Sequence, residues 1–242
     1  MLRSAAWLRA ALPQCCVLCA TPSFDALLCR ECLDDMPRIE GPCPSCALSS
    51  PAGQTCGACL ATPPPQSATI GAWCYAFPAD RLLHELKYGG RLALAEPFAD
   101  ALVAAVGLRG NPRPDCIVAL PLAVARQRMR GFNQAQEIGR RVALRLDVPL
   151  VAALRRVRDT PPQAGLALDA RARNVRHAFE AIVPLEGLTV AIVDDVMTTG
   201  ATVAEAAAAL RRAGAARVDA WVVARTPPPA RRTPQNPVLA VA

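Results

Sequence analysis

The chain has 242 residues, of which 52% are hydrophobic, and it carries a formal net charge of +7. Its length allows one sizeable core plus a smaller module. No run of about 18 uninterrupted apolar residues appears, so neither a membrane span nor membrane insertion is expected. The positive charge suits an anionic partner, either a phosphorylated small molecule or a nucleic acid, but an Arg-rich composition can also reflect genomic base bias alone.

Residues 1–14 are predicted to form a short amphipathic helix. The apolar segment from Leu2 to Leu12 could be taken for a signal peptide, but Arg9 interrupts it and no clear cleavage site precedes the cysteines. We therefore expect a cytoplasmic protein.

Eight of the eleven cysteines form four C-x-x-C pairs, and nine residues separate the first pair from the second and the third from the fourth. The pairs are Cys16/Cys19, Cys29/Cys32, Cys43/Cys46 and Cys56/Cys59. A gap of two residues lets both thiolates bind one tetrahedral ion, and two pairs complete a zinc site of four thiolates. The repeat predicts a double zinc ribbon, with two structural Zn²⁺ ions, over residues 15–62.

The cysteines allow two other arrangements. A disulfide framework would require an oxidising compartment, and the chain shows no secretion signal. A cross-braced pair of zinc sites would use the same eight ligands, but the repeated spacing favours sequential sites. Cys15 is an alternative to Cys16, whereas Cys74 and Cys116 lie in apolar runs where a buried free thiol is usual.

Residues 61–66 contain three consecutive prolines and are expected to form a stiff linker after the cysteine-rich module. The expected strands beyond it are 68–77, 116–120, 148–154, 189–193 and 217–224, and the expected helices are 80–88, 94–106, 134–146 and 203–212. Strands that alternate with helices indicate an α/β fold with a parallel sheet and right-handed crossovers. This domain is expected over residues 66–226, before a Pro-rich, disordered tail over 227–242.

Two Arg-rich segments accompany the strands. Arg126, Arg128 and Arg130 follow the strand 116–120 and are expected in a loop, where guanidinium groups could hold a pyrophosphate, although alternating arginines are more often a solvated face. Residues 155–176 form a long basic stretch, which is typical of a lid that closes over a charged ligand or of a disordered segment.

Residues 189–202 carry the strongest functional signal. The apolar run 189–193 predicts a strand buried on both faces, and we expect it to stop at Asp194 and Asp195. The acids and the following turn, 198–202, would then lie at the carboxyl end of a parallel strand, where open α/β sheets bind ligands.

The residue types in this stretch suit a sugar phosphate. Hydroxyls and free amides of residues 198–202 can surround a phosphate, and adjacent carboxylates can accept hydrogen bonds from ribose hydroxyls. Two acids followed by Thr-Thr-Gly resemble the 5-phosphoribosyl-1-pyrophosphate (PRPP) loop of type I phosphoribosyltransferases. The alternatives are an Asp pair that closes a turn, or a metal- or phospho-accepting aspartate of another α/β protein.

Several motifs together resemble the ComF family. They are the double C-x-x-C ribbon, HELKYGGR (84–91), PLAVARQRMRGFNQ (121–134), RDTPPQAGL (158–166), RARNVRHAF (171–179) and VDDVMTTGAT (193–202). The resemblance implies an N-terminal zinc finger and a type I phosphoribosyltransferase-like domain, associated with DNA uptake in natural competence. Residues 121–124 depart from the family pattern, which often has a His or Lys after the Leu.

The resemblance also implies roles for single residues. It assigns Asp194 and Asp195 to a catalytic pair on the ribose, with PRPP bound together with Mg²⁺. It assigns the turn to substrate binding through Thr198, Thr199, Gly200, Ala201 and Thr202, and the pyrophosphate side to Arg128, Arg130, Gly131, Asn133 and Gln134. The implied partners are PRPP, single-stranded DNA and the competence helicase machinery.

Three functions remain open from the sequence. The first is a ComF-type protein that binds PRPP and works on incoming single-stranded DNA. The second is a salvage phosphoribosyltransferase that moves a nucleobase onto PRPP, although no base-recognising feature is visible. The third is a zinc-ribbon adaptor without turnover.

Overall fold

The computed structural model describes residues 14–24, 26–158 and 175–228. The predicted N-terminal helix lies outside the described residues except for Gln14. Most of the predicted lid (159–174) and nearly all of the predicted tail (229–242) also lie outside them.

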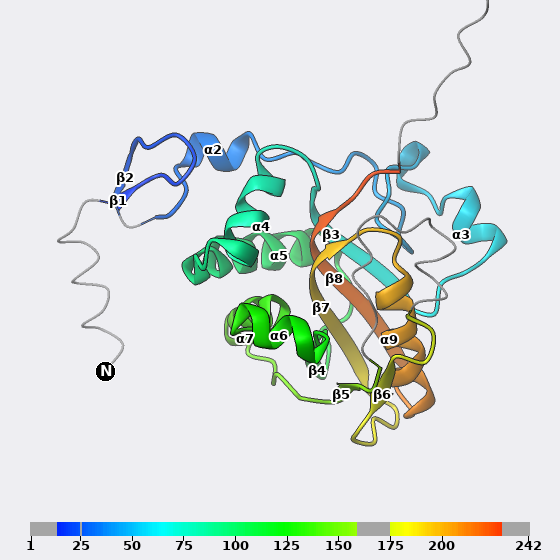
Figure 1. The fold of residues 1–242 in the computed structure, drawn as a ribbon. Coiled ribbons are helices and arrows are strands. Elements are labelled where there is room, and N and C mark those ends of the chain that lie inside the picture. The colour runs from blue at the N-terminus through cyan, green and yellow to red at the C-terminus, as the bar shows by residue number, and fades with distance from the viewer. Residues whose placement is uncertain (1–13, 25, 159–174, 229–242) are drawn as a thin grey trace, which may run out of the picture.

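Four parallel strands form the central sheet, in the order β3 (Ala68–Cys74), β8 (Arg217–Arg225), β7 (Thr189–Met197) and β4 (Cys116–Ala119) (Figure 1). The two central strands consist mainly of β-branched and small apolar residues, and most of their side chains are buried. Such runs are typical of strands covered on both faces. The predicted parallel α/β sheet is confirmed.

Strand β7 does not stop at the two acids, so that expectation is wrong. Asp194 pairs with Val222, and the ladder continues until Met197 pairs with Arg225. The strand extends because β8 runs beside it to Arg225 and offers backbone partners throughout.

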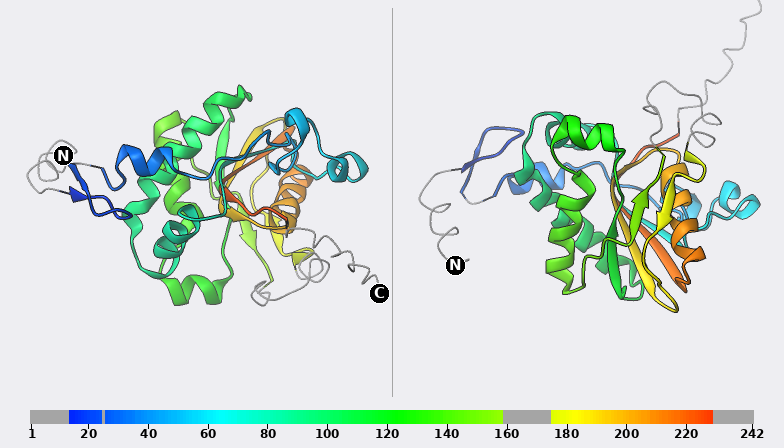
Figure 2. Two further views of the ribbon diagram at one scale, coloured as in Figure 1. Left: turned by 90° about the horizontal axis from the view of Figure 1, so that it is seen from above. Right: turned by 60° about the horizontal axis from the view of Figure 1, so that its bottom comes forward.

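Helices cover both faces of the sheet (Figure 2). On one face, α4 (Ala79–Tyr88), α5 (Ala95–Arg109) and α7 (Gln134–Leu146) share a core with Ala191 and Val193 of β7. On the other face, α9 (Ala201–Arg212) shares a core with Val190 and Ile192. Because successive strand residues face opposite sides, this alternation directs Asp195 toward α4 and Asp194 toward α9.

The remaining elements correct two expectations. Arg126, Arg128 and Arg130 lie on or at the end of a short helix, α6 (Val124–Arg130), and not in a loop. Residues 148–154 do not form one strand. Leu150 makes a single parallel bridge to Ile117, and the chain then turns away into β5 (Leu154–Arg156), which pairs antiparallel with β6 (Phe179–Ala181).

The cysteine-rich module contains only short elements. They are β1 (Gln14–Cys15), β2 (Pro22–Phe24), α2 (Arg30–Asp34), the 3₁₀ turn Pro51–Gly53 and α3 (Gly57–Ala61), and a second 3₁₀ turn, Leu92–Leu94, precedes α5. Its first half lies beside α4 and α5, and its second half lies at the β3 side of the sheet (Figures 1 and 2). In the described part of the chain, every helix is too short or too polar to cross a membrane.

Candidate functional site

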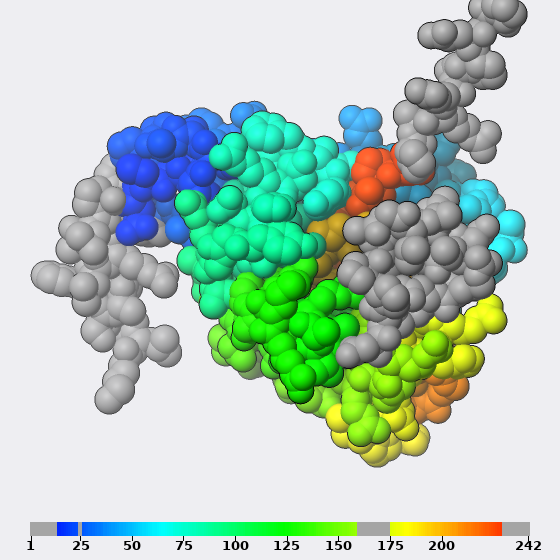
Figure 3. All heavy atoms as spheres, in the orientation of Figure 1, coloured from blue at the N-terminus to red at the C-terminus, as the bar shows by residue number. Residues whose placement is uncertain are grey.

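A pocket of about 410 Å³ opens where β4 and β7 end. In the space-filling view, a hollow between α4 (teal) and α6 (green) exposes gold-coloured atoms near the end of β7 (Figure 3). The acids and the turn that follows them form one side, and α4 and α6 form the other. Its polar lining residues are Tyr75, Lys87, Tyr88, Arg126, Arg130, Asn133, Gln134, Arg156, Asp194, Asp195, Thr198 and Thr202.

An ion pair spans this pocket. The Nζ atom of Lys87, on α4, lies 2.9 Å from Oδ2 of Asp195. Desolvation alone would lower the pKa of Lys87, but attraction to Asp195, and more weakly to Asp194, raises it above its ordinary value. Lys87 is therefore a charged member of the site in the free protein.

Asp194 is the acid whose negative charge is disfavoured by its surroundings. Burial raises its pKa well above the ordinary Asp value, and repulsion from Asp195 raises it further; the Lys87 charge opposes this only in part. Two adjacent carboxylates in a largely buried site thus share one nearby cation, which favours the protonated form of Asp194 when no ligand is bound.

The Asp194→Asn variant should raise the stability of the free protein at neutral pH. An acid whose pKa is raised by folding binds more protons in the folded state, so the free energy of unfolding falls as pH rises from about 3.9 through the folded pKa. Asn has no charge to bury, so thermal unfolding should show a higher Tm at neutral pH and a flatter pH profile. Each 1 kcal/mol gained corresponds to roughly 2–4 °C in a chain of this size.

The matched control is Asp195→Asn, which has the same shape but breaks the Lys87 ion pair. It should lower the Tm. A lower Tm for Asp194→Asn as well would show that the Asp194 charge is not destabilising.

Two buried donors on the α6 side of the pocket lack partners among the described residues. Arg130 donates from Nη1 to Oε1 of Gln134 (3.1 Å) and from Nη2 to the hydroxyl of Tyr88 (3.0 Å). Its Nε atom, and Nε2 of Gln134, have no hydrogen-bond acceptor there. Gln134 is only 1% exposed. Because an unpaired buried donor costs about 1–3 kcal/mol, a ligand that brings acceptor oxygens would relieve this cost.

The pocket brings together most of the residues assigned from the sequence. Those that line it are Asp194, Asp195, Thr198, Gly200, Thr202, Arg130, Asn133 and Gln134, and those outside the lining are Thr199, Ala201, Arg128 and Gly131. Asn133 already uses its amide, since it caps α7 through Ala135 N and donates to the Leu120 carbonyl. Gly131 ends α6 in the left-handed region, with φ of 77°.

The sequence reasoning named Arg126 but missed Lys87, Tyr75, Tyr88 and Met129. Lys87 could have been found from HELKYGGR, which carries the family resemblance, because helical spacing makes Leu82, Leu83 and Leu86 the buried face and leaves Lys87 at its edge. No pattern in the sequence pairs it with Asp195.

The cysteines form two sequential clusters. Cys16, Cys19, Cys29 and Cys32 bring their Sγ atoms within 4.8 Å of one another, and so do Cys43, Cys46, Cys56 and Cys59. Sγ–Sγ distances of 3.6 Å (Cys19–Cys29) and 3.7 Å (Cys46–Cys56) match the roughly 3.8 Å edge of a tetrahedron with Zn–S bonds of about 2.3 Å. The arrangement is sequential and not cross-braced.

Backbone amides favour one thiolate in each cluster. Burial raises the pKa of Cys16, but hydrogen bonds from the Cys19 and Cys29 backbone lower it to about 6. Burial also raises the pKa of Cys43, but backbone hydrogen bonds from Cys56 and Cys46 outweigh this effect and lower the pKa to about 7. Four sulfurs at this spacing, one ionised near neutral pH, can bind structural zinc.

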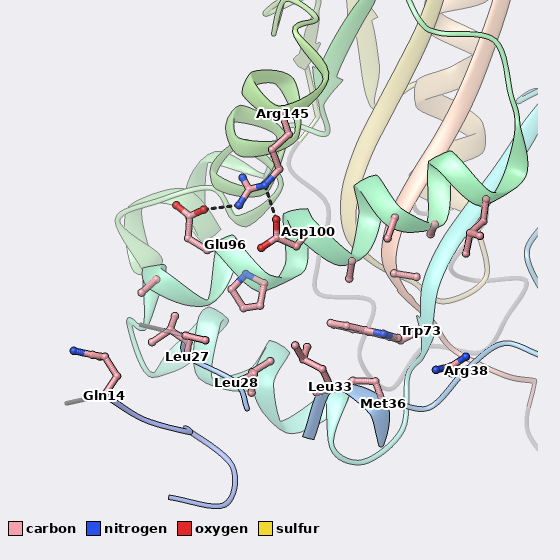
Figure 4. A pocket seen from close by; sticks show the side chains of 18 residues that line it. Gln14, Leu27, Leu28, Leu33, Met36, Arg38, Trp73, Glu96, Asp100 and Arg145 are labelled. Atoms are coloured by element: carbon pink, nitrogen blue, oxygen red, sulfur yellow. Dashed lines mark hydrogen bonds and ion pairs between the residues drawn. The ribbon is translucent and has the colours of Figure 1, made fainter. Parts of the chain in front are cut away.

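A second cavity, of about 780 Å³, lies between the first cluster and α5 (Figure 4). Its walls are mainly apolar and include Leu28, Leu33, Met36 and Trp73. At one side Arg145 donates to Glu96 (2.7 Å) and to Asp100 (2.6 Å), so both carboxylates are already paired. This cavity holds neither the acid pair nor the unpaired donors of the other pocket.

Comparison with known proteins gives the family. A model described as phosphoribosyl transferase domain matches residues 129–239. The DNA utilization protein YhgH of Salmonella typhi is 38% identical over 225 residues, which cover 89% of this chain and 98% of that protein. Competence protein F of Haemophilus influenzae is 32% identical over 182 residues, 71% of this chain and 79% of that one. The chain belongs to the ComF family.

The ComF assignment confirms the predicted resemblance, and with it the phosphoribosyltransferase-type sheet domain behind two cysteine clusters. It depends on the relatives and not on superposition. The glutamine PRPP amidotransferase of B. subtilis, for example, superposes with a TM-score of 0.39 at 20% identity, over 57% of this chain and 30% of that one.

Proposed function

We propose that this ComF-family protein binds PRPP in the pocket at the end of β7 and that it handles incoming single-stranded DNA in natural competence. The observation that supports PRPP best is the conjunction, in one pocket of about 410 Å³, of an acid pair, a hydroxyl-bearing turn and two unpaired buried donors. The three groups match the three parts of PRPP, and the volume suits a small ligand.

Each part of PRPP has a place in this arrangement. The 5-phosphate would lie against the turn 198–202, where the positive end of the α9 dipole favours an anion. The ribose hydroxyls would donate to Asp194 and Asp195, with Lys87 released from Asp195. The pyrophosphate would lie near Arg130 and Gln134, whose unpaired N–H groups then gain acceptors.

Magnesium fits the same pocket. Mg²⁺ is usually held by one or two carboxylates together with substrate phosphates, and Asp194 and Asp195 are the carboxylates available here. When bound, it would neutralise pyrophosphate charge. Arg130 and Gln134 would stabilise the same pyrophosphate charge directly. This charge increases if the phosphoribosyl group is transferred to an acceptor, because the pyrophosphate then leaves.

The Arg130→Met variant should bind PRPP about tenfold or more weakly, since a hydrogen bond to a charged group contributes about 1.5–3 kcal/mol. Its affinity for ribose 5-phosphate, which has no pyrophosphate, should stay nearly unchanged. Calorimetric titration with both ligands measures this. Arg128→Met is the matched control, because Arg128 lies on the same helix but is exposed and outside the pocket lining. If Arg130→Met loses the same affinity for both ligands, the pyrophosphate does not bind at Arg130.

The DNA role is supported by the relatives named DNA utilization protein and competence protein F, and by the net charge of +7. Single-stranded DNA should bind with an affinity that falls with salt, with a slope of about −0.7 per phosphate contact. Filter binding over a salt series measures the slope. If no single-stranded DNA is retained at low salt, the DNA part of the proposal fails and PRPP binding stands by itself.

A further inference from the structure

Arg225, the last residue of β8, joins the second cysteine cluster to the turn 198–202, called the phosphate turn below after the ligand proposed for it. It is 4% exposed, and its guanidinium group donates to backbone carbonyls on two separate segments. Nε donates to the carbonyl of Cys46 (2.8 Å). Nη1 donates to the carbonyls of Met197 (2.9 Å) and Thr198, and to that of the neighbouring Thr226 (2.9 Å).

On the cluster side, the sheet domain donates hydrogen bonds to consecutive carbonyls of the first C-x-x-C turn of that cluster, Cys43–Cys46. The carbonyl of Pro44 accepts from Thr69 N (2.8 Å), and that of Ser45 accepts from Thr69 Oγ1 (2.6 Å). The Cys46 carbonyl then accepts from Arg225. Three consecutive carbonyls of this C-x-x-C turn thus accept hydrogen bonds from the sheet domain. A change in the shape of the C-x-x-C turn would therefore displace the carbonyl to which Arg225 donates.

On the pocket side, the two carbonyls that Arg225 holds begin the phosphate turn. Met197 ends β7, and Thr198 lines the pocket. The turn closes two residues later at Gly200, whose φ of 85° places it in the left-handed region. A Cβ there would lie 2.5 Å from the Cε atom of Met197, which is the movable end of that side chain, so the left-handed backbone is what favours glycine here. Because Arg225 holds the carbonyls of Met197 and Thr198, it constrains the peptide units that lead into this turn.

Charge strengthens the link. Within the described ranges, Arg225 has no carboxylate partner, although burial makes a lone cation costly. A zinc ion held by four thiolates carries a net double negative charge, so a loaded cluster would supply the missing countercharge.

We infer that Arg225 is a positioning residue through which the second cysteine cluster fixes the phosphate turn. The inference rests on the proposed function for the turn's ligand, but the contacts are independent of it. An ordered, metal-loaded cluster holds the Cys46 carbonyl, Arg225 bonds to that carbonyl and to residues 197 and 198, and the turn is thereby preset for the 5-phosphate. Loss of order in the cluster would loosen the turn.

The first cysteine cluster gives an internal contrast. Among the residues that the structure describes, no hydrogen bond joins 14–36 to 66–228, and the next bond along the chain runs from Cys74 N to the Pro37 carbonyl (2.7 Å), beyond the last cysteine of this cluster. The two parts pack mainly through apolar side chains around the larger cavity (Figure 4). The first cluster should therefore have no comparable effect on the phosphate turn.

The test compares full-length Arg225→Met with Arg109→Met. Arg109 also donates to the second ribbon, at the Pro42 carbonyl (2.8 Å), but does not contact the turn. Backbone hydrogen exchange of residues 197–202 and calorimetric affinity for ribose 5-phosphate are measured for both. Arg225→Met should speed hydrogen exchange in residues 197–202 and lower the affinity for ribose 5-phosphate by about tenfold or more. Arg109→Met should change neither the exchange nor the affinity. Arg225→Lys, which keeps the charge but not the fork, should keep the fold and still lose the turn protection.

A second pair of variants covers the case in which Arg225→Met does not fold. Cys56→Ser with Cys59→Ser should speed exchange in 197–202, and Cys29→Ser with Cys32→Ser, in the first cluster, should not. Equal effects of the two clusters, or unchanged exchange after loss of the second, would overturn the inference. If wild-type protein binds no ribose phosphate at all, the proposed function fails, and the exchange measurements still decide the role of Arg225.

Discussion

Removal of metal should unfold residues 15–62 and leave the sheet domain folded. The core of the second cluster consists of Cys43, Cys46 and Cys59, with Leu48 and Cys56 partly buried beside them, so its own apolar core is very small. Structural zinc contributes about 10–16 kcal/mol of apparent binding free energy in small zinc-finger peptides, which is far more than such a core can supply. The sheet domain has two large cores, and only Cys16, Leu28 and Met36 of the first one come from the cysteine-rich module as fully buried members.

The measurement combines metal analysis with hydrogen exchange before and after a strong chelator. Protein purified without chelator should contain two zinc ions per chain, one for each cluster of four cysteines. After chelation, protection should be lost over residues 15–62 and weakened over 197–202, and it should be kept in residues 189–196 of β7, in β8 and in α7. Fewer than one zinc per chain, or protection that survives chelation, would contradict a structural metal role.

The double variant Asp194→Asn, Asp195→Asn should bind PRPP more than tenfold more weakly, and losses of a hundredfold or more are reasonable. Each ribose contact to a charged group is worth about 1.5–3 kcal/mol, and about 1.4 kcal/mol is tenfold in affinity. The variant also leaves Lys87 without its partner. Thermal unfolding must first show that the double variant is folded.

Asp115→Asn is the matched control for the double variant. Asp115 is also a carboxylate of the sheet, but it lies just before β4 and accepts from the backbone N–H of Thr189 (2.7 Å), at the opposite end of β7 from the pocket. Its PRPP affinity should stay within about twofold of wild type. An unchanged affinity in a folded double variant would remove the ribose role from the acid pair.

Much of the fold could be predicted because local signals agreed with the final packing. The helix Gln134–Leu146 was predicted with the observed bounds, since Asn133 caps its first turn and a leucine ends its apolar face. The cysteine spacing also led to the observed sequential clusters, because each C-x-x-C turn is a local structure.

The errors arose where distant partners decide the structure. Strand β7 passes through Asp194 and Asp195 because β8 pairs with it as far as Arg225, which no local pattern in 189–202 reveals. Residues 148–154 contain enough apolar residues for a strand, but only Leu150 finds a neighbour in β4.

The site shows the same division. The acids, the turn and Arg130 were recognisable from local motifs. The Lys87–Asp195 ion pair and the contacts of Arg225 join segments far apart in the chain, so they became visible only in the folded structure.

The most direct measurement is calorimetric titration of the zinc-loaded, full-length protein with PRPP in the presence and absence of Mg²⁺. Binding at one site per chain is expected, strengthened by Mg²⁺ and competed by both ribose 5-phosphate and pyrophosphate, because the pocket places its acids, its turn and its unpaired donors around one ligand. The absence of saturable binding up to millimolar PRPP, in folded protein that contains its zinc, would contradict a PRPP site in this pocket.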